Sequence, residues 1–390
     1  MNKNKKPSLL LHALVNPEKV SAYTLADWDL LIRQGRSIDM LARLYVKLRD
    51  AEVISAIPSQ PLRHMCWAYQ LTQRHKQAIR LEVEGLMDAL APLGAPVVLL
   101  KGAAYSYGGL APAEGRLFSD IDILLPEGLL PAAEKLLQKQ GWLTSSLDEY
   151  DQNYYRRWMH ELPPLTHGQR QTELDVHHAI LPKTAKVYPS SQLLLADIVY
   201  FSPSKNLYRL GDADLILHSA THLFFDGEMQ HGLRDLEDID SLFRVYCQRQ
   251  SDWLNLLARG EKLQLSYPLF YAMHYCGKWF ETPIPADIYR AAEALTKASG
   301  LHRKWMTWLF DRGLMPDHPS CYDRWTAFAR WVLYVRSHYL KMPMHLLIPH
   351  LLHKSFWGPL KQRWKERKRS EPNTLDKLLE EGRAADINAP

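Results

Sequence analysis

The stretch Phe118-Ser-Asp-Ile-Asp-Ile-Leu-Leu125 places two carboxylates inside a short apolar segment, which Pro126 and Gly128 close. Its apolar and β-branched residues predict a strand, and alternate side chains of a strand share one face. Asp120 and Asp122 therefore point the same way, about 7 Å apart along the backbone. Two like charges that project together from an apolar strand are costly unless a cation neutralises them. Mg²⁺, held by carboxylates and substrate phosphates, is the usual solution.

The Asp-x-Asp pattern alone is a weak signal, because the chain also contains it at Asp212/Asp214 and at Asp238/Asp240. Both of these pairs fall in segments with helical periodicity, where residues i and i+2 point apart. We expect them to be helix-cap or surface residues. Only the strand context distinguishes the first pair, for which a solvated edge strand is the alternative.

A second strand with polar residues on one face is expected at 171–180, QTELDVHHAI. Glu173, Asp175 and His177 alternate with apolar residues and so share a face. If this strand neighbours the first one, Asp175 completes a cluster of three carboxylates, which can hold two metal ions. The alternative is a surface position on an antiparallel strand of alternating polarity.

Upstream, the segment Leu99-Leu-Lys-Gly-Ala-Ala104 is typical of a strand followed by the start of a helix. Gly102 allows a phosphate to approach the backbone, and a helix N-terminus offers free N–H donors. Lys101 and Arg116 can supply positive charge to a triphosphate. Alternatively, they pair with the carboxylates as structural ions.

The pattern of the whole chain predicts an α+β protein with a small α/β region between helical regions. Helical periodicity fills residues 22–50 and 63–93 and returns from residue 212 onward. We divide the chain into an N-terminal helical region, an α/β core, a C-terminal helical region and a polar tail, at residues 1–93, 94–205, 206–369 and 370–390.

Composition excludes several classes of protein. The 390 residues carry a formal net charge of +5, which is mild for this length. The four cysteines are widely separated and form no CxxC pair, so we expect a cytoplasmic protein with neither disulfides nor a zinc site. His218 and His222 have a zinc-binding spacing but lack a third ligand at a telling distance. No apolar run is long enough to span a membrane.

One segment, 354–369, is strongly basic, with many Lys and Arg against a single Glu and with interleaved Phe, Trp and Leu residues. Such a segment can lie on an anionic membrane surface or contact nucleic-acid phosphates. The alternative is a terminal helix that packs its aromatic side chains on the protein body.

These motifs together resemble the DNA polymerase β-type nucleotidyltransferase superfamily and, more narrowly, the bacterial uncharacterised nucleotidyltransferase family. The residues that carry the resemblance, which covers roughly residues 25–245, are Leu100-Lys101-Gly102, then Arg116, then Ser119-Asp-Ile-Asp122-Ile-Leu, and later Leu174-Asp175-Val176-His177-His178. The superfamily usually has Ser or Gly after the glycine, whereas Ala103 stands there in this chain. A hydroxyl contact to phosphate is therefore missing, and Lys101 can compensate for it.

The resemblance implies a polymerase β-like core, a small mixed sheet with helices, that transfers a nucleoside monophosphate from an NTP to an acceptor hydroxyl or phosphate. The metal would be Mg²⁺, with Mn²⁺ as an alternative. Asp120 and Asp122 would bind it, and Asp175 would bind metal or act as a general base. The implied nucleotide-binding residues are Lys101, Gly102, Arg116, Ser119 and His177.

Two other functions stay open at this point. One is a toxin-like enzyme that adds nucleotides to tRNA. The other is a non-catalytic scaffold or a membrane-peripheral accessory protein with a degenerate transferase fold, for which the basic segment 354–369 would be the contact to a membrane or to nucleic acid.

Overall fold

The computed structural model describes residues 8–144, 149–202, 205–225, 227 and 229–352. The chain forms two compact units, Met1–Lys341 and Met342–Pro390. In the second unit the structure describes helix α16 (Met344–Leu352). The predicted basic segment 354–369 and polar tail 370–390 lie outside the described residues. All that follows concerns the first unit.

A seven-stranded mixed sheet has the order β3-β4-β5-β2-β1-β7-β6. Its central strand β2 runs parallel to β5 and antiparallel to β1, which in turn runs parallel to β7. The strands are β1 (Val97–Leu99), β2 (Asp120–Leu124), β3 (Trp142–Thr144), β4 (Leu165–His167), β5 (Glu173–His177), β6 (Ile198–Ser202) and β7 (Leu207–Leu210). The predicted α+β class is confirmed. The polymerase β-like core and the four region boundaries stay predictions, and β7 carries the sheet past residue 205.

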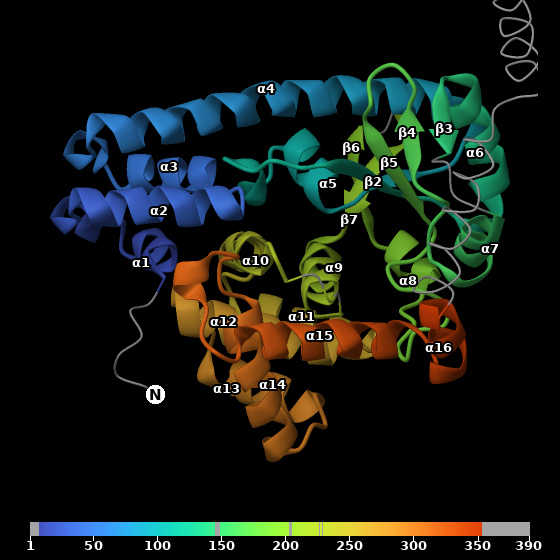
Figure 1. Cartoon of the computed structure of the whole chain (residues 1–390). Coiled ribbons are helices and arrows are strands. Elements are labelled where there is room, and N and C mark those ends of the chain that lie inside the picture. The colour runs from blue at the N-terminus through green and yellow to red at the C-terminus, as the bar shows by residue number, and fades with distance from the viewer. Residues whose placement is uncertain (1–7, 145–148, 203–204, 226, 228, 353–390) are drawn as a thin grey trace, which may run out of the picture. The chain divides into compact units, whose positions relative to one another are not determined.

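The two faces of the sheet pack into different cores, as strand alternation requires. Ile121 and Ile123 of β2 lie in one core with the long helix α4 (Ser59–Leu90) and α6 (Leu130–Lys139). Leu124 belongs to the other core, together with α9 (Asp212–Phe225). Figure 1 shows α4 running above the sheet and α9 below it. Asp120 and Asp122 alternate with the two isoleucines and so face the α9 side.

The N-terminal helices lie beneath the other half of α4 in Figure 1: α1 (Leu9–Val15), α2 (Leu25–Ser37) and α3 (Leu41–Asp50). The prediction of one continuous helix over 22–50 is wrong. The chain breaks at Asp39, which has a left-handed backbone with φ of 55°, and the Met40 N–H then bonds back to the Gly35 carbonyl at 2.8 Å. Asp tolerates this conformation better than most residues do, which explains why the helix stops there.

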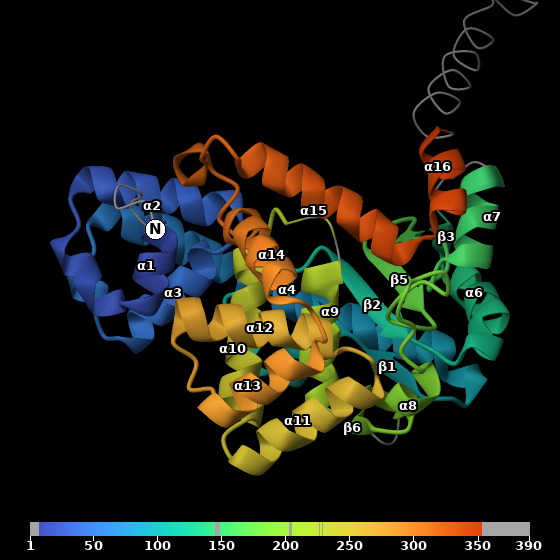
Figure 2. The same cartoon turned by 90° about the horizontal axis from the view of Figure 1, so that it is seen from below.

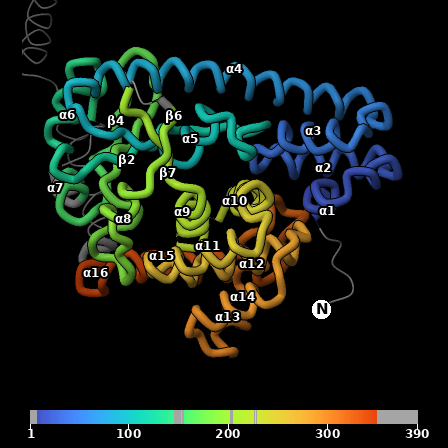
Figure 3. Tube along the Cα trace, turned by 180° about the vertical axis from the view of Figure 1, so that it is seen from behind, coloured from blue at the N-terminus to red at the C-terminus, as the bar shows by residue number. Residues whose placement is uncertain are grey.

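The remaining helices gather around α9 and α10, as the view from below shows (Figure 2). Aromatic rings fill their centre: Phe224, Tyr271 and Phe310 lie with centroids 5.0–5.8 Å apart. From behind, β7 leads directly into α9 (Figure 3). These helices are α10 (Gly232–Tyr246), α11 (Gln250–Lys262), α12 (Ser266–Phe280), α13 (Ala286–Leu295), α14 (Gly300–Gly313) and α15 (Thr326–Lys341), while α5 (Lys101–Gly108), α7 (Glu149–Trp158) and α8 (Ser191–Leu195) connect strands. Among the described helices, none combines the length and hydropathy needed to cross a bilayer.

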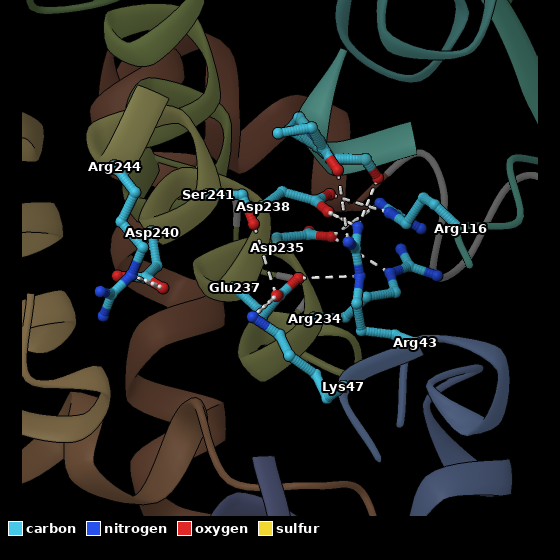
Figure 4. Close-up of polar contacts among 12 residues, drawn as sticks. Arg43, Lys47, Arg116, Arg234, Asp235, Glu237, Asp238, Asp240, Ser241 and Arg244 are labelled. Atoms are coloured by element: carbon cyan, nitrogen blue, oxygen red, sulfur yellow. Dashed lines mark hydrogen bonds and ion pairs between the residues drawn. The ribbon is translucent and has the colours of Figure 1, made fainter. Parts of the chain in front are cut away.

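A buried network of ion pairs joins α3 to α10 (Figure 4). The Arg43 Nε lies 3.0 Å from Glu237, which also receives Lys47 at 3.0 Å. The same guanidinium donates to the carbonyl of Pro112 at 2.5 Å. Arg116 approaches the neighbouring carboxylate, Asp238, at 2.8 Å. The network therefore connects the N-terminal helices, the loop before β2 and α10.

The expectation that the pairs Asp212/Asp214 and Asp238/Asp240 are helix-cap or surface residues is wrong for three of these four carboxylates. Asp214, Asp238 and Asp240 are buried, with exposed fractions of 0%, 4% and 2%. Asp214 pairs with Arg259 at 2.6 Å, and Asp240 pairs with Arg244 at 2.9 Å. Arginines within the helix or from neighbouring elements make this burial tolerable, which local periodicity does not reveal.

We predict that Arg43→Met lowers the free energy of unfolding by about 3–5 kcal/mol, because it leaves buried carboxylates short of a cation. Urea denaturation followed by circular dichroism measures this loss. The matched control is Arg33→Met on α2, whose pair with Asp29 is exposed and should be worth about 1 kcal/mol or less. Equal losses in the two variants would contradict a structural role for the network.

Candidate functional site

The turn between β1 and α5 has an unusual backbone. Lys101, the first residue of α5, has a φ of 36°, in the left-handed region that non-glycine residues seldom adopt. The next residue, Gly102, faces the ring of Phe118 so closely that a Cβ there would collide with it. The glycine is therefore required by the packing of Phe118. That ring occupies the side from which the sequence predicts a phosphate to approach.

The two predicted strands are neighbours, and their register aligns Asp122 with Asp175 and Leu124 with His177. Asp122 is 6% exposed. Its Oδ2 lies 3.4 Å from the Nζ of Lys101, and its Oδ1 lies 2.9 Å from the Nε2 of His177. The structure thus brings Lys101, Asp122, Asp175 and His177 together from three different elements.

The two aligned carboxylates differ in their ionisation. Burial opposes the charged form of Asp122, but Lys101 and the hydrogen bond from His177 outweigh it and hold the pKa of Asp122 well below its usual range. Burial, with Glu161 and Asp122 nearby, raises the pKa of Asp175 to about 7. At neutral pH, Asp122 is thus ionised, whereas Asp175 is present in both its ionised and its protonated form.

Glu161 is a site residue that the sequence analysis missed. Its Oε2 lies 3.2 Å from the Nδ1 of His177, so the imidazole stands between Glu161 and Asp122. Burial opposes the charged imidazole, but the hydrogen bond to Asp122 and the charge of Glu161 raise the pKa of His177. No periodic pattern singles out Glu161, which lies in His-Glu-Leu-Pro-Pro. Only knowledge that this segment pairs with β5 would have revealed it.

Two groups of described side chains have the composition and spacing of metal ligands. In the first, donor atoms of Asp122, Asp175 and His177 all lie within 4.8 Å of one another, and in the second the same holds for His160, Glu161 and His177. The paired carboxylates of the first group fit Mg²⁺ or Mn²⁺, and their burial side by side fits a bound cation. Neither described group includes His218 and His222.

A cavity of about 410 Å³ lies between β2 and the helices α9 and α10. Asp120 and Asp122 stand on its wall, and the Asp120 Oδ1 accepts a hydrogen bond from the Ser119 hydroxyl at 3.0 Å. The wall also includes Lys101, Gly102, Phe118, Arg116, His222, His231 and Arg234. Among the described residues, Asp175 and His177 are not part of the lining, so they stand behind Asp122.

Arg116 lines this cavity but is held by α10 rather than by the carboxylates of β2. Its side chain bonds to Asp235 at 3.0 Å and to Asp238 at 2.8 Å. Beside it, the Nε of Arg234 lies 3.2 Å from Asp235. Burial and the nearby Arg116 lower the pKa of Arg234, because both disfavour its charged form. An anion bound at this wall would stabilise that charge. Arg234 is the second site residue that the sequence analysis missed.

The sequence matches one known family. A sequence model of the family described as "Uncharacterised nucleotidyltransferase" matches residues 24–281, more than half of the chain. No curated protein and no solved structure matches the chain. The matched range includes every predicted site residue and also Glu161 and Arg234.

We predict that Asp175→Asn stabilises the metal-free protein at pH 8 by on the order of 3 kcal/mol and has little effect near pH 4. The raised pKa means that the protonated carboxyl stabilises the fold at low pH, and this stability is lost as the pH rises from about 4 through about 7.

Thermal unfolding in the presence of a chelator, from pH 4 to pH 8, measures the effect. Asp88→Asn, an exposed carboxyl on α4, is the control and should show no such trend. A gain from Asp175→Asn that is the same at both ends of the range would contradict the assignment.

Proposed function

The chain belongs to the uncharacterised nucleotidyltransferase family and is thereby a transferase, and we propose that it moves a nucleoside monophosphate from an NTP to an acceptor in a reaction that depends on Mg²⁺ or Mn²⁺. The observation that carries this proposal is the placement of Asp120 and Asp122 on the wall of a cavity that Lys101, Arg116 and Arg234 also line, next to the aspartates Asp39, Asp235 and Asp238. A metal–triphosphate complex needs both features.

We assign metal binding to Asp120, Asp122 and Asp175. When bound, the divalent cation supplies charge stabilisation to the reacting phosphate and to the leaving pyrophosphate. Lys101 and His177 keep Asp122 ionised and oriented. Asp175, whose pKa is about 7 without metal, would be held in its ionised, metal-binding form by the charge of the cation.

We assign the triphosphate to the cationic part of the cavity wall. Lys101, Arg116 and Arg234 all line this wall. Arg234 is the more available of the two arginines for a new anion, because its ion pairs with Asp235 and Asp39, at 3.2 and 3.9 Å, are longer than those of Arg116, at 3.0 and 2.8 Å. The N-terminus of α5 adds backbone N–H donors, but contact of a phosphate with Gly102 itself stays a prediction, because the ring of Phe118 packs against that residue.

The role of His177 follows from its burial. The sequence predicts that it contacts the nucleotide, whereas its ring lies between two carboxylates and is 6% exposed. We therefore propose that it orients Asp122 through the hydrogen bond between its Nε2 and the carboxylate, as a hydrogen-bonded partner orients a metal ligand. Direct contact with the nucleotide stays an untested prediction.

We predict that Asp120→Asn and Asp122→Asn each lower NTP turnover by roughly 10²–10³-fold or more. Each change weakens binding of the divalent cation, which stabilises the negative charge of the transition state. Isothermal titration of the four NTPs, with and without Mg²⁺ or Mn²⁺, measures binding, and pyrophosphate release measures turnover.

The matched control is Asp212→Asn, which changes a second Asp-x-Asp pair whose first carboxylate is exposed. It should behave like the unaltered protein. Metal-independent NTP binding that survives both β2 substitutions would refute the proposal and favour a non-catalytic scaffold.

We predict that Glu161→Gln weakens Mg²⁺ or Mn²⁺ binding by roughly 10–100-fold, because His177 loses the carboxylate that fixes its ring. Titration with Mn²⁺, followed by electron paramagnetic resonance, measures the free ion directly. Glu173→Gln on the same strand as His177 is the control, since Glu173 is exposed. Unchanged affinity in Glu161→Gln would show that Asp122 and Asp175 need no such support.

A further inference from the structure

An aromatic and apolar surface covers the outer side of α15 and the adjoining part of α14. We call it the aromatic face: Trp305, Trp325, Phe328, Trp331, Tyr334, Val335 and Tyr339, each 41–60% exposed. Several of these rings form a continuous chain with Trp308, with centroids 5.2–6.5 Å apart. Single exposed apolar residues are ordinary, but a contiguous surface of this kind marks an interaction site.

The charges around the aromatic face are positive. Arg324 lies 5.5 Å from the ring centroid of Trp325, and the ammonium of Lys186 lies 3.1 Å from that of Tyr339. Lys304, next to Trp305, is exposed. Within the described part of the first unit, residues 324–341 contain four Lys or Arg and no Asp or Glu. The nearest acidic residues, Asp317 and Asp323, are paired with Arg330 and Arg312.

We propose that the aromatic face binds the surface of an anionic lipid bilayer. Trp and Tyr side chains are the ones that prefer the boundary between lipid and water. Neighbouring Lys and Arg are attracted to anionic headgroups, and the two contributions add. The proposal is independent of nucleotidyl transfer, since it uses no residue of the cavity.

The same observations disfavour three other occupants. A symmetric second copy would place this cationic surface against itself. Nucleic acid needs open ring faces, whereas Trp305 already stacks on Trp308 and the ring of Tyr339 already carries the Lys186 ammonium. The acidic tail 370–390 has the right charge but contains no aromatic residue to continue the ring chain.

The test is flotation of the full chain with unilamellar vesicles of phosphatidylcholine alone or with about 30% phosphatidylglycerol. We expect binding to the anionic vesicles only, and loss of that binding at roughly 0.5 M salt. Trp331→Ala combined with Tyr334→Ala should lower the bound fraction roughly five-fold or more, because the apolar contact is lost. The control is Trp67→Ala, an equally exposed tryptophan on α4, which should bind as the unaltered protein does.

Four outcomes would overturn the proposal. Two concern the vesicles: the full chain does not bind anionic vesicles, or the double variant binds them as well as the unaltered protein does. The third is binding that appears only after deletion of 370–390. The fourth is a dimer in light scattering that Trp331→Ala converts to a monomer. Anisotropy with a labelled oligo(U) provides a fifth arm, in which RNA binding lost in the double variant while vesicle binding persists would identify nucleic acid as the occupant. Thermal unfolding confirms that each variant is folded.

Discussion

The site depends on the ionised carboxylate of Asp122 and on its contacts with Lys101 and His177. A buried charge is tolerated only when other groups neutralise it, and here Lys101 and His177 approach its two oxygens from different elements. The β2–β5 register places Asp175 beside it, and Glu161 holds the far side of His177. One strand position thus determines where a helix N-terminus, a second strand and a loop must lie.

The surrounding helices give this site its second wall. Arg116 lies shortly before β2, yet its guanidinium is bonded to two carboxylates of α10, and Arg43 of α3 pairs with the same helix. The cavity is therefore formed by the α/β core and the C-terminal helices together. This explains why residues from both regions, Asp120 and Arg234 among them, face the same space.

Local pattern was enough to predict the elements that carry the carboxylates. Alternation in 118–125 and 171–180 correctly separated the polar from the apolar face of each strand, because that property depends only on neighbours in the chain. What the sequence could not show was set by distant contacts. Glu161 and Arg234 became visible only through pairing with β5 and packing of α10, and the burial of Asp214 and Asp238 depends on Arg259 and Arg116, which are distant in the sequence.

The contact between Gly102 and Phe118 has a consequence for how this chain can vary. Since a methyl group at 102 would collide with the aromatic ring, a substitution at 102 becomes acceptable only after the residue at 118 has become smaller. The two positions are therefore epistatic, because the geometry requires the change at 118 to come before the change at 102. Related chains that have lost the glycine should carry a smaller residue in place of the phenylalanine, and an alignment of them should show the two columns changing as one.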